Sequence, residues 1–226
     1  MKQVKVLING INGKMGQALQ RLIQTRPEFG LSFAGGRESG EEVHVDFDVL
    51  IDFSTPQGAQ EAFALAKQHR KAFLTGTTNL PETFLFQMQA EEKIPVFYAP
   101  NVSLSVYFFT ELVRQAARMY GGYATKLHEI HHVHKKDAPS GTAKNIAAAI
   151  GFPTQQVTYE RVGETVGTHV AQFATDFDEI TLSHKALNRD LFAASALDIA
   201  RWLVSQEKGF YTMKDFAKFK LKEQTK

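Results

Sequence analysis

Hydrophobic positions in the first half of the chain follow two spacings in turn. Short apolar runs, which are typical of buried strands, lie at residues 4–8, 31–34, 47–53, 72–74 and 96–98. Apolar residues recur three or four positions apart between residues 15 and 23, and helices are also predicted after Pro56 and Pro81. This alternation of about five strand–helix units predicts a mostly parallel sheet with helices on both faces.

The pattern changes beyond residue 102. One helix is predicted over residues 103–120, followed by a strand over residues 125–133. Another helix is predicted over residues 142–150, with Ser140 as its N-cap. Three β-rich runs with the spacing of a meander, and then a last helix, lie at residues 157–161, 168–174, 179–185 and 191–205. The change from alternating elements to successive strands predicts a second domain.

The composition excludes several classes of protein. Hydrophobic residues make up 43% and charged residues 22% of the 226 residues, which is typical of a globular chain. The net charge of +2 is too small for strong sequence-independent binding to nucleic acid or to an acidic membrane. The absence of cysteine excludes disulfides, cysteine-bound zinc, iron–sulfur clusters and thiol catalysis. No apolar run approaches ~18 residues, so we expect a cytoplasmic protein without a membrane partner.

A glycine-rich loop, Gly10-Ile11-Asn12-Gly13-Lys14-Met15-Gly16, joins the first predicted strand to the first predicted helix. It matches G-x-x-G-x-x-G, a variant of the dinucleotide-binding loop in which glycines let the backbone approach a pyrophosphate at a helix N-terminus. Lys14 adds a cation near the phosphates. The alternative interpretation is an ordinary strand–helix turn with incidental glycines.

The end of the second predicted strand bears on the choice of cofactor. NAD-specific sites usually have an acidic residue there, whereas an arginine accommodates the 2′-phosphate of NADP. This chain has Arg37 and no carboxylate at the strand end itself, although Glu38 follows. We therefore expect NADPH to be preferred over NADH, with a solvated surface charge as the alternative role of Arg37.

The densest group of polar side chains lies at residues 129–142, EIHHVHKKDAPSGT. His131, His132 and His134 could be metal ligands, but strand alternation would place His131 on one face and the other two on the opposite face. A zinc site needs its ligands together, so we expect no metal. Surface histidines on an edge strand are the structural alternative.

The same segment fits acid–base chemistry on an anionic substrate. Histidine titrates near neutrality, and a lysine in a partly desolvated cationic cluster can donate a proton. Ser140-Gly141-Thr142 opens a helix, so its free N–H groups and hydroxyls form a site for a carboxylate. A serine nucleophile is disfavoured because the chain has no G-x-S-x-G elbow.

Several motifs together resemble one enzyme family. They are the glycine loop, the strand end Asp52-Phe53-Ser54-x-Pro56, Gly76-Thr77-Thr78, Ala99-Pro100-Asn101-x-Ser103 and, above all, E-x-H-H-x-x-K-x-D-A-P-S-G-T-A from Glu129 to Ala143. Arg161-x-Gly163, Gly167-x-His169 and His184-Lys185-Ala186 continue the likeness. The chain resembles the 4-hydroxy-tetrahydrodipicolinate reductase family, also called dihydrodipicolinate reductase, over nearly its whole length.

The resemblance implies a fold and an activity. The fold would be α/β, with a Rossmann-like dinucleotide-binding domain at residues 1–102 and 188–226. An α+β domain with an open mixed sheet, at residues 103–187, would bind the substrate and mediate a homotetramer. The activity would be NAD(P)H-dependent reduction of 4-hydroxy-tetrahydrodipicolinate, a small dicarboxylate, in lysine biosynthesis through diaminopimelate.

The resemblance also implies roles for individual residues. His131 would be the acid/base and Lys135 the proton donor, while the substrate carboxylates would be bound by His132, Ser140, Gly141 and Thr142. The cofactor would be bound by Gly10, Ile11, Asn12, Gly13, Lys14, Met15, Arg37, Gly76, Thr77, Thr78, Ala99, Pro100, Asn101 and Val102.

The chain departs from the family pattern at a few positions. Asn79, Ser105, Tyr107 and Ser195 stand where the family usually has Gly, Gly, Asn and Gly, and the stretch from residue 37 to 48 is short. These differences bear on cofactor affinity and choice, because the acid–base segment is complete. The alternatives are another two-domain NAD(P)-dependent dehydrogenase and a catalytically silent nicotinamide-binding regulator.

Overall fold

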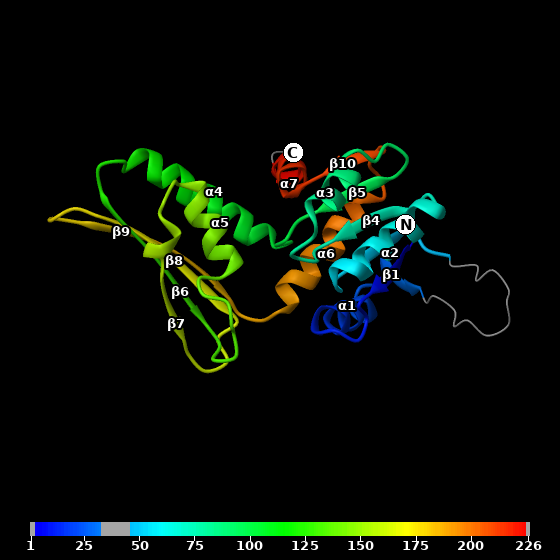
Figure 1. Ribbon diagram of the computed structural model, residues 1–226, viewed down its shortest axis with the longest axis horizontal. Helices are drawn as coiled ribbons and strands as arrows, with labels where there is room; N and C mark the ends of the chain where they lie inside the picture. The colour runs from blue at the N-terminus through cyan, green and yellow to red at the C-terminus, as the bar shows by residue number, and fades with distance from the viewer. Residues whose placement is uncertain (1–2, 33–45, 225–226) are drawn as a thin grey trace. The chain divides into compact units, whose positions relative to one another are not determined.

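The computed structural model describes residues 3–32 and 46–224 (Figure 1). The chain forms two compact units, the first made of Met1–Val102 and Phe192–Lys226 and the second of Ser103–Leu191. The first boundary coincides with the one expected from the sequence, and the second lies a few residues beyond it. Within the described residues, no helix is both long and apolar enough to cross a membrane.

The first unit is built on a parallel sheet of six strands, in the order β10-β5-β4-β3-β1-β2. The strands are β1 (Val4–Asn9), β2 (Phe29–Ser32), β3 (Val49–Asp52), β4 (Ala72–Thr75), β5 (Pro95–Tyr98) and β10 (Gly209–Tyr211). This confirms the predicted parallel sheet and its Rossmann-like order. Strand β10 was not predicted, because three residues are too few to show a periodic pattern.

Helices cover both faces of this sheet (Figure 1). They are α1 (Lys14–Thr25), α2 (Pro56–Gln68), α3 (Glu82–Gln89), α6 (Asp190–Leu203) and α7 (Met213–Gln224). Helix α2 begins where the sequence predicts, because the Thr55 hydroxyl accepts a hydrogen bond from the Gly58 N–H and Pro56 occupies the first helical turn.

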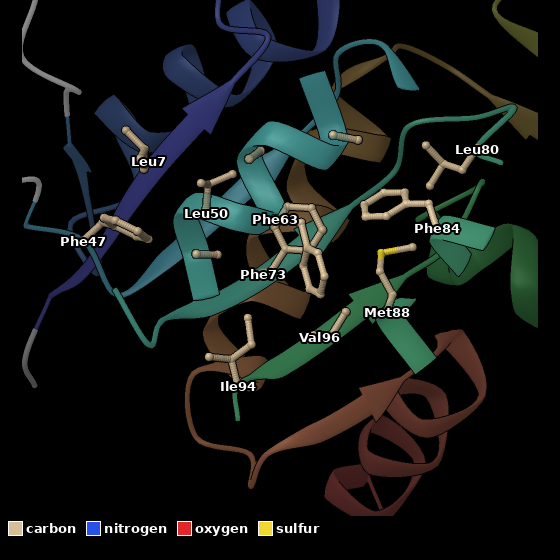
Figure 2. Packing of buried hydrophobic residues seen from close by; sticks show 13 residues of the cluster. Leu7, Phe47, Leu50, Phe63, Phe73, Leu80, Phe84, Met88, Ile94 and Val96 are labelled. Atoms are coloured by element: carbon tan, nitrogen blue, oxygen red, sulfur yellow. The ribbon is translucent and has the colours of Figure 1, made fainter. Parts of the chain in front are cut away.

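One face of the sheet packs against α2 and α3 in a continuous hydrophobic core (Figure 2). Leu7, Leu50, Phe73 and Val96 contribute one side chain from each of four neighbouring strands. Phe73 is fully buried, and its replacement by alanine would cost about 3–5 kcal/mol. Successive residues of a strand point to opposite faces, and every residue of β3 and β4 is buried, so both faces of these two strands are covered.

The opposite face packs against α6, whose Trp202 ring contacts Phe97 edge to face at 6.3 Å between centroids. Strand β1 pairs with β2 on one side and with β3 on the other, so the sheet grows in opposite directions from β1. In sheets of this type, ligands bind outside the carboxyl ends of the strands at this switch point. The sheet therefore places the glycine loop after β1 at the usual ligand position.

The second unit has a mixed sheet in the order β7-β6-β8-β9. Its elements are α4 (Leu104–Met119), β6 (Ala124–His131), α5 (Gly141–Ala149), the 3₁₀ turn η1 (Thr154–Gln156), β7 (Thr158–Arg161), β8 (Gly167–Ala174) and β9 (Glu179–Ala186). Helices α4 and α5 lie on one face of the sheet (Figure 1), where Phe109, Val113, Ile146 and Phe173 are buried in one core. The predicted open mixed sheet is confirmed.

The predicted meander is wrong for β7. Strands β8 and β9 form an antiparallel pair, but β7 pairs with β6, in parallel, at the far edge of the sheet. The segment that contains α5 and η1 is long enough to carry the chain back over the sheet, which a parallel neighbour requires. This crossover puts Arg161, the last residue of β7, beside His131, the last residue of β6.

Candidate active site

The glycine loop of the first unit has the backbone geometry of a phosphate-binding turn. Gly10 has a φ of 82°, and a Cβ there would lie 2.3 Å from the carbonyl oxygen of Phe53. A Cβ on Gly16 would lie 2.4 Å from the Gly10 carbonyl oxygen. Glycine is therefore required at both positions, because α1 and the β3–α2 loop approach the turn closely.

The start of helix α1 suits an anion. Its N-cap residue, Gly13, has no side chain to occupy the first N–H groups of the helix, and Lys14 is exposed. Glutamine side chains from α1 hold the loop from behind, since Gln17 Nε2 donates to the Asn12 carbonyl and Gln20 Nε2 donates to the Ile11 carbonyl. The loop fits the pyrophosphate of a dinucleotide on its own geometry.

A buried carboxylate, Asp52, lies at the carboxyl end of β3, directly beneath the switch point. It is fully buried and accepts four hydrogen bonds of 2.5–2.8 Å, from Asn9 Nδ2 and from the hydroxyls of Ser54, Thr75 and Thr77. Asn9 ends β1 and Thr75 ends β4, so one side chain ties together the ends of three adjacent strands. The sequence motif includes Asp52, but its donors are evident only once the strands are paired.

The segment expected to lie near the nicotinamide follows β4. Gly76 packs on the Phe53 ring so closely that a Cβ would lie 2.1 Å from Cε1. Asn79 has a φ of 58°, in the left-handed region, and it replaces the glycine of the family pattern. Asparagine tolerates this conformation better than most residues, so the departure leaves the local backbone intact.

The other expected cofactor residues differ in how far they are buried. The Ala99 N–H donates to the Thr75 carbonyl, which places the segment Ala99 to Val102 beside the Gly76 turn. Ala99 and Val102 are buried, whereas Pro100 and Thr78 are exposed. Arg37, on which the expected NADPH preference depends, lies outside the described residues.

The second unit contains a buried acid–base cluster at the end of β6. Glu129 is fully buried, and its Oε1 accepts hydrogen bonds from the Ser140 N–H at 2.9 Å and from Arg161 Nη2 at 3.2 Å. Its Oε2 lies 3.4 Å from His131 Nδ1 and 3.7 Å from His169 Nε2. The predicted acid/base residue is thus oriented by a carboxylate two residues earlier on the same strand.

The pKa values in this cluster are shifted from their ordinary values. Burial opposes ionisation of Glu129, but hydrogen bonds from Ser140 and Arg161 and the electrostatic attraction of His131 outweigh it and lower the pKa of the carboxyl group. Burial also lowers the pKa of His131, with Lys135 and Arg161 acting in the same direction and Glu129 opposing them. Glu129 is therefore the ionised partner and His131 the neutral one at neutral pH.

Lys135 lies in the loop after β6, where Nζ donates to Asp137 Oδ1 at 2.8 Å. The backbone of this loop is held by Arg161, which donates from Nε to the Lys135 carbonyl and from Nη2 to the Asp137 carbonyl. The same guanidinium binds Glu129, so one side chain connects the buried carboxylate to the lysine loop. The structure thus brings His131 and Lys135 into one network.

The N-terminus of α5 adjoins this network. Ser140 caps the helix, as predicted, because its Oγ accepts from the Ala143 N–H at 3.1 Å. Gly141 is exposed, and among the described residues no atom lies within 4 Å of where its Cβ would be. Packing therefore does not require glycine at this position, which leaves the helix end open to a ligand.

His132 turns away from the buried cluster. Its Nε2 lies 3.1 Å from Nη2 of Arg189, a cation outside the motifs of the sequence. The expected strand alternation through His134 is wrong because β6 ends at His131. His134 is exposed, and its Nε2 lies 3.8 Å from Glu164 Oε1. No sequence signal marks Arg189, which is far from His132 along the chain.

Comparisons with known proteins were made on the sequence and on the fold. The family model "Dihydrodipicolinate reductase, N-terminus" matches residues 4–102, and "Dihydrodipicolinate reductase, C-terminus" matches residues 105–217. The 4-hydroxy-tetrahydrodipicolinate reductase of Xanthomonas euvesicatoria pv. vesicatoria (strain 85-10) is 38% identical over 94% of this chain and 97% of its own length. The 4-hydroxy-tetrahydrodipicolinate reductase of Campylobacter jejuni subsp. jejuni serotype O:6 is 33% identical over 94% of this chain and 98% of its own length.

A solved structure has the same fold. It is a dipicolinate-bound dihydrodipicolinate reductase from Paenisporosarcina sp. TG-14, which matches with a TM-score of 0.74 at 21% identity. The match covers 93% of this chain and 97% of the other. At this identity the likeness supports the fold, while the family models and the sequence relatives identify the kind of protein.

Proposed function

Because the chain belongs to the dihydrodipicolinate reductase family, we propose that its two polar networks perform the NAD(P)H-dependent reduction of 4-hydroxy-tetrahydrodipicolinate in lysine biosynthesis. When bound, the nicotinamide supplies the hydride. The chain itself must bind two carboxylates, hold the cofactor and provide a proton. The observation that carries this assignment is the buried Glu129–His131 pair, linked through Arg161 to the loop of Lys135.

In this proposal, Lys135 Nζ gives up the proton and His131 is the neighbouring acid/base. Glu129 Oε2 faces His131 Nδ1, which favours a proton on that nitrogen and directs Nε2 toward Gly167. Asp137 holds the Lys135 ammonium by a hydrogen bond. Glu129 and Arg161 act through other residues and are positioning residues in this scheme.

The test is the replacement of Lys135 by alanine. General-acid catalysis contributes roughly 10²- to 10⁴-fold, so kcat should fall by that order while the Kd for the cofactor stays unchanged. Lys136→Ala is the matched control, because it removes the exposed neighbouring ammonium. Equal kcat values for Lys135→Ala and the unmodified protein would refute the assignment of the proton donor.

The substrate carboxylates are proposed to bind at the N-terminus of α5 and near His132. Gly141 and Thr142 lie in the first turn of the helix, which Ser140 caps, and Arg189 adds a cation beside His132. Gly141→Ala should raise the KM for the substrate with a small effect on stability, because the added methyl has space in the described structure. An unchanged KM would argue against carboxylate binding at this helix end.

The cofactor is proposed to bind along the glycine loop, with Gly10 to Met15 at the pyrophosphate and residues 76–78 and 99–102 at the nicotinamide end. The NADPH preference rests on Arg37 and on the lack of an acidic residue at the strand end. A coupled assay with freshly made synthase product, run separately with NADPH and NADH, tests this preference. Arg37→Glu should shift the ratio of the two KM values toward NADH, and no shift would refute it.

The two units have separate proposed roles. The first would bind the dinucleotide, and the second would bind the substrate and form a homotetramer through the face of its sheet that α4 and α5 leave uncovered. That face presents Ile130 and Val170 among polar side chains. Light scattering on a sizing column tests the tetramer. The proposed place of action is the cytoplasm, where NADPH is regenerated.

A further inference from the structure

Three buried side chains from two neighbouring strands converge on one point in the second unit. Glu129 and His131 come from β6, and His169 comes from β8, where it pairs directly with Glu129 in the sheet register. All three are buried, and one nitrogen or oxygen atom from each lies within 4.8 Å of the others. They supply two imidazoles and a carboxylate, the ligand set of many zinc sites.

The two distances from the carboxylate oxygen to the imidazole nitrogens suit a common metal ion. Ligands around a tetrahedral zinc, with bonds of about 2.0–2.2 Å, are separated by about 3.3 Å. Glu129 Oε2 lies 3.4 Å from His131 Nδ1 and 3.7 Å from His169 Nε2. The two ring centroids are 5.2 Å apart, close to the about 5 Å expected for two imidazoles on one tetrahedral ion.

The hydrogen bonding of the cluster leaves two of the three metal-binding atoms available, while His169 Nε2 lies 3.4 Å from Ser140 Oγ. Among the described residues, neither Glu129 Oε2 nor His131 Nδ1 has a hydrogen-bond partner, although both atoms are buried. Buried polar atoms are seldom left this way in folded proteins. The other carboxylate oxygen is held by Ser140 and Arg161, the kind of outer partner that orients a metal-binding carboxylate.

We propose that Glu129, His131 and His169 form a binding site for a divalent transition-metal ion, best matched by zinc, and that the bound ion inhibits the enzyme by engaging His131. Arg161 Nη2 lies 3.2 Å from Glu129 Oε1, and the positive charge of the guanidinium lowers the affinity of the carboxylate for a second cation. The site is therefore a reversible one rather than that of a resident structural ion. The inhibition rests on the proposed role of His131, whereas the binding does not.

The proposal is tested first by binding to the full-length, metal-free protein. Equilibrium dialysis with Zn²⁺ should give one ion per chain at this site, and Co²⁺ should give the intense visible absorption of a four-coordinate or five-coordinate ion. Long-range ¹H–¹⁵N spectra of the imidazoles should show the resonances of His131 and His169 shifting together. These measurements on the unmodified chain do not depend on the folding of any variant.

Variants then locate the site. His169→Gln should weaken zinc binding by at least about tenfold. His128→Gln is the matched control, because it removes an imidazole from the opposite face of β6. His134→Gln tests the His132–His134 pair, whose ring centroids are 6.2 Å apart, as the alternative site. Zinc binding that survives His169→Gln, or that is lost in His134→Gln, would overturn the proposal.

Inhibition is measured at free zinc concentrations fixed by a metal buffer, because the dicarboxylate substrate can itself bind the ion. Zinc should lower kcat in the unmodified protein and in His128→Gln over the concentration range in which it binds. Full activity of the zinc-bound protein would overturn the inhibitory role. A chain that binds zinc as described but shows no reductase activity without it would refute the proposed function and leave the metal site standing.

Discussion

The Asp52 network allows a quantitative test of how the first unit holds its cofactor loops. Replacing Asp52 by asparagine keeps the shape of the side chain but turns one acceptor oxygen into an NH₂ donor. Either oxygen accepts two hydrogen bonds, Oδ1 from Asn9 and Ser54 and Oδ2 from Thr75 and Thr77. The new NH₂ group must therefore face two groups that now donate to it.

The cost follows from the chemistry of these contacts. A hydrogen bond to a charged group contributes about 1.5–3 kcal/mol, so two lost bonds would cost roughly 3–6 kcal/mol. Rotation of the hydroxyls recovers part of this, but Thr75 Oγ1 already accepts from the Thr77 N–H and Thr77 Oγ1 from the Ser54 N–H. We expect the free energy of unfolding to fall by about 3 kcal/mol, which for a chain of this size lowers Tm by roughly 6–12 °C.

Cofactor affinity should fall as well. Asp52 joins Asn9, which leads into the glycine loop, to Thr77, which lies in the segment proposed to contact the nicotinamide. Part of the lost stabilisation should appear as displacement of these loops, which would have to be reversed when the cofactor binds. A cost of about 1.4 kcal/mol would raise the Kd for NADPH tenfold. The assay is a thermal melt combined with fluorescence titration of NADPH.

Asp48→Asn is the control. Asp48 lies just before β3, at the opposite end of the strand, and its Oδ2 accepts from the Lys5 N–H at 3.0 Å. Its replacement should leave NADPH affinity unchanged. If Asp52→Asn bound NADPH as the unmodified protein does and melted within about 2 °C of it, the idea that this carboxylate positions the cofactor loops would be refuted.

Three further predictions concern the second unit. Gly167→Ala should lower kcat by roughly 10- to 100-fold with little change in Tm, because the added Cβ would lie 2.9 Å from His131 Nε2 and turn the ring; an unchanged kcat would show that the ring has room. Arg161→Lys should lower kcat and alter its pH profile, since lysine cannot also reach the Lys135 carbonyl; a profile identical to that of the unmodified protein would contradict this. Burial lowers the pKa of His169 from 6.5 to about 4. As the pH falls, this histidine is therefore protonated in the unfolded chain before it is protonated in the folded one. The free energy of unfolding should consequently drop by about 3 kcal/mol between pH 6.5 and 4. Urea titrations across this range should show a smaller drop for His169→Gln, and an equal drop would assign the pH dependence to other groups.

Local sequence was sufficient to predict most of the helices and strands up to residue 205, and one of the two networks in part. Apolar runs located five of the six strands of the parallel sheet, because few polar residues interrupt these runs. The glycine loop was predictable because Gly10 and Gly16 meet requirements of backbone conformation and close packing that no other residue meets. The spacing of Glu129 and His131 already placed both on one face of a strand.

Residues contributed by distant strands could not be found this way. Arg161 reaches Glu129 only because β7 crosses over to lie parallel to β6, whereas the spacing of the strands suggested a meander. His169 faces Glu129 because of the antiparallel register of β6 and β8. The periodicity of a strand predicts which face of the sheet a side chain lies on. Its partner on the neighbouring strand depends on the order of the strands, which is set by how the crossover segments pack on the sheet.

The two buried carboxylates show how similar burial leads to different chemistry. Asp52 is surrounded by hydroxyl and amide donors that satisfy both of its oxygens, so the group is suited to fixing backbone positions. Glu129 has one oxygen held by Ser140 and Arg161, while the other faces two imidazoles and has no hydrogen bond within the described part of the chain. That second oxygen can exchange partners, a proton on His131 or a metal ion, without disturbing the strand. The acid–base role and the proposed metal site are therefore two consequences of one incomplete hydrogen-bond shell.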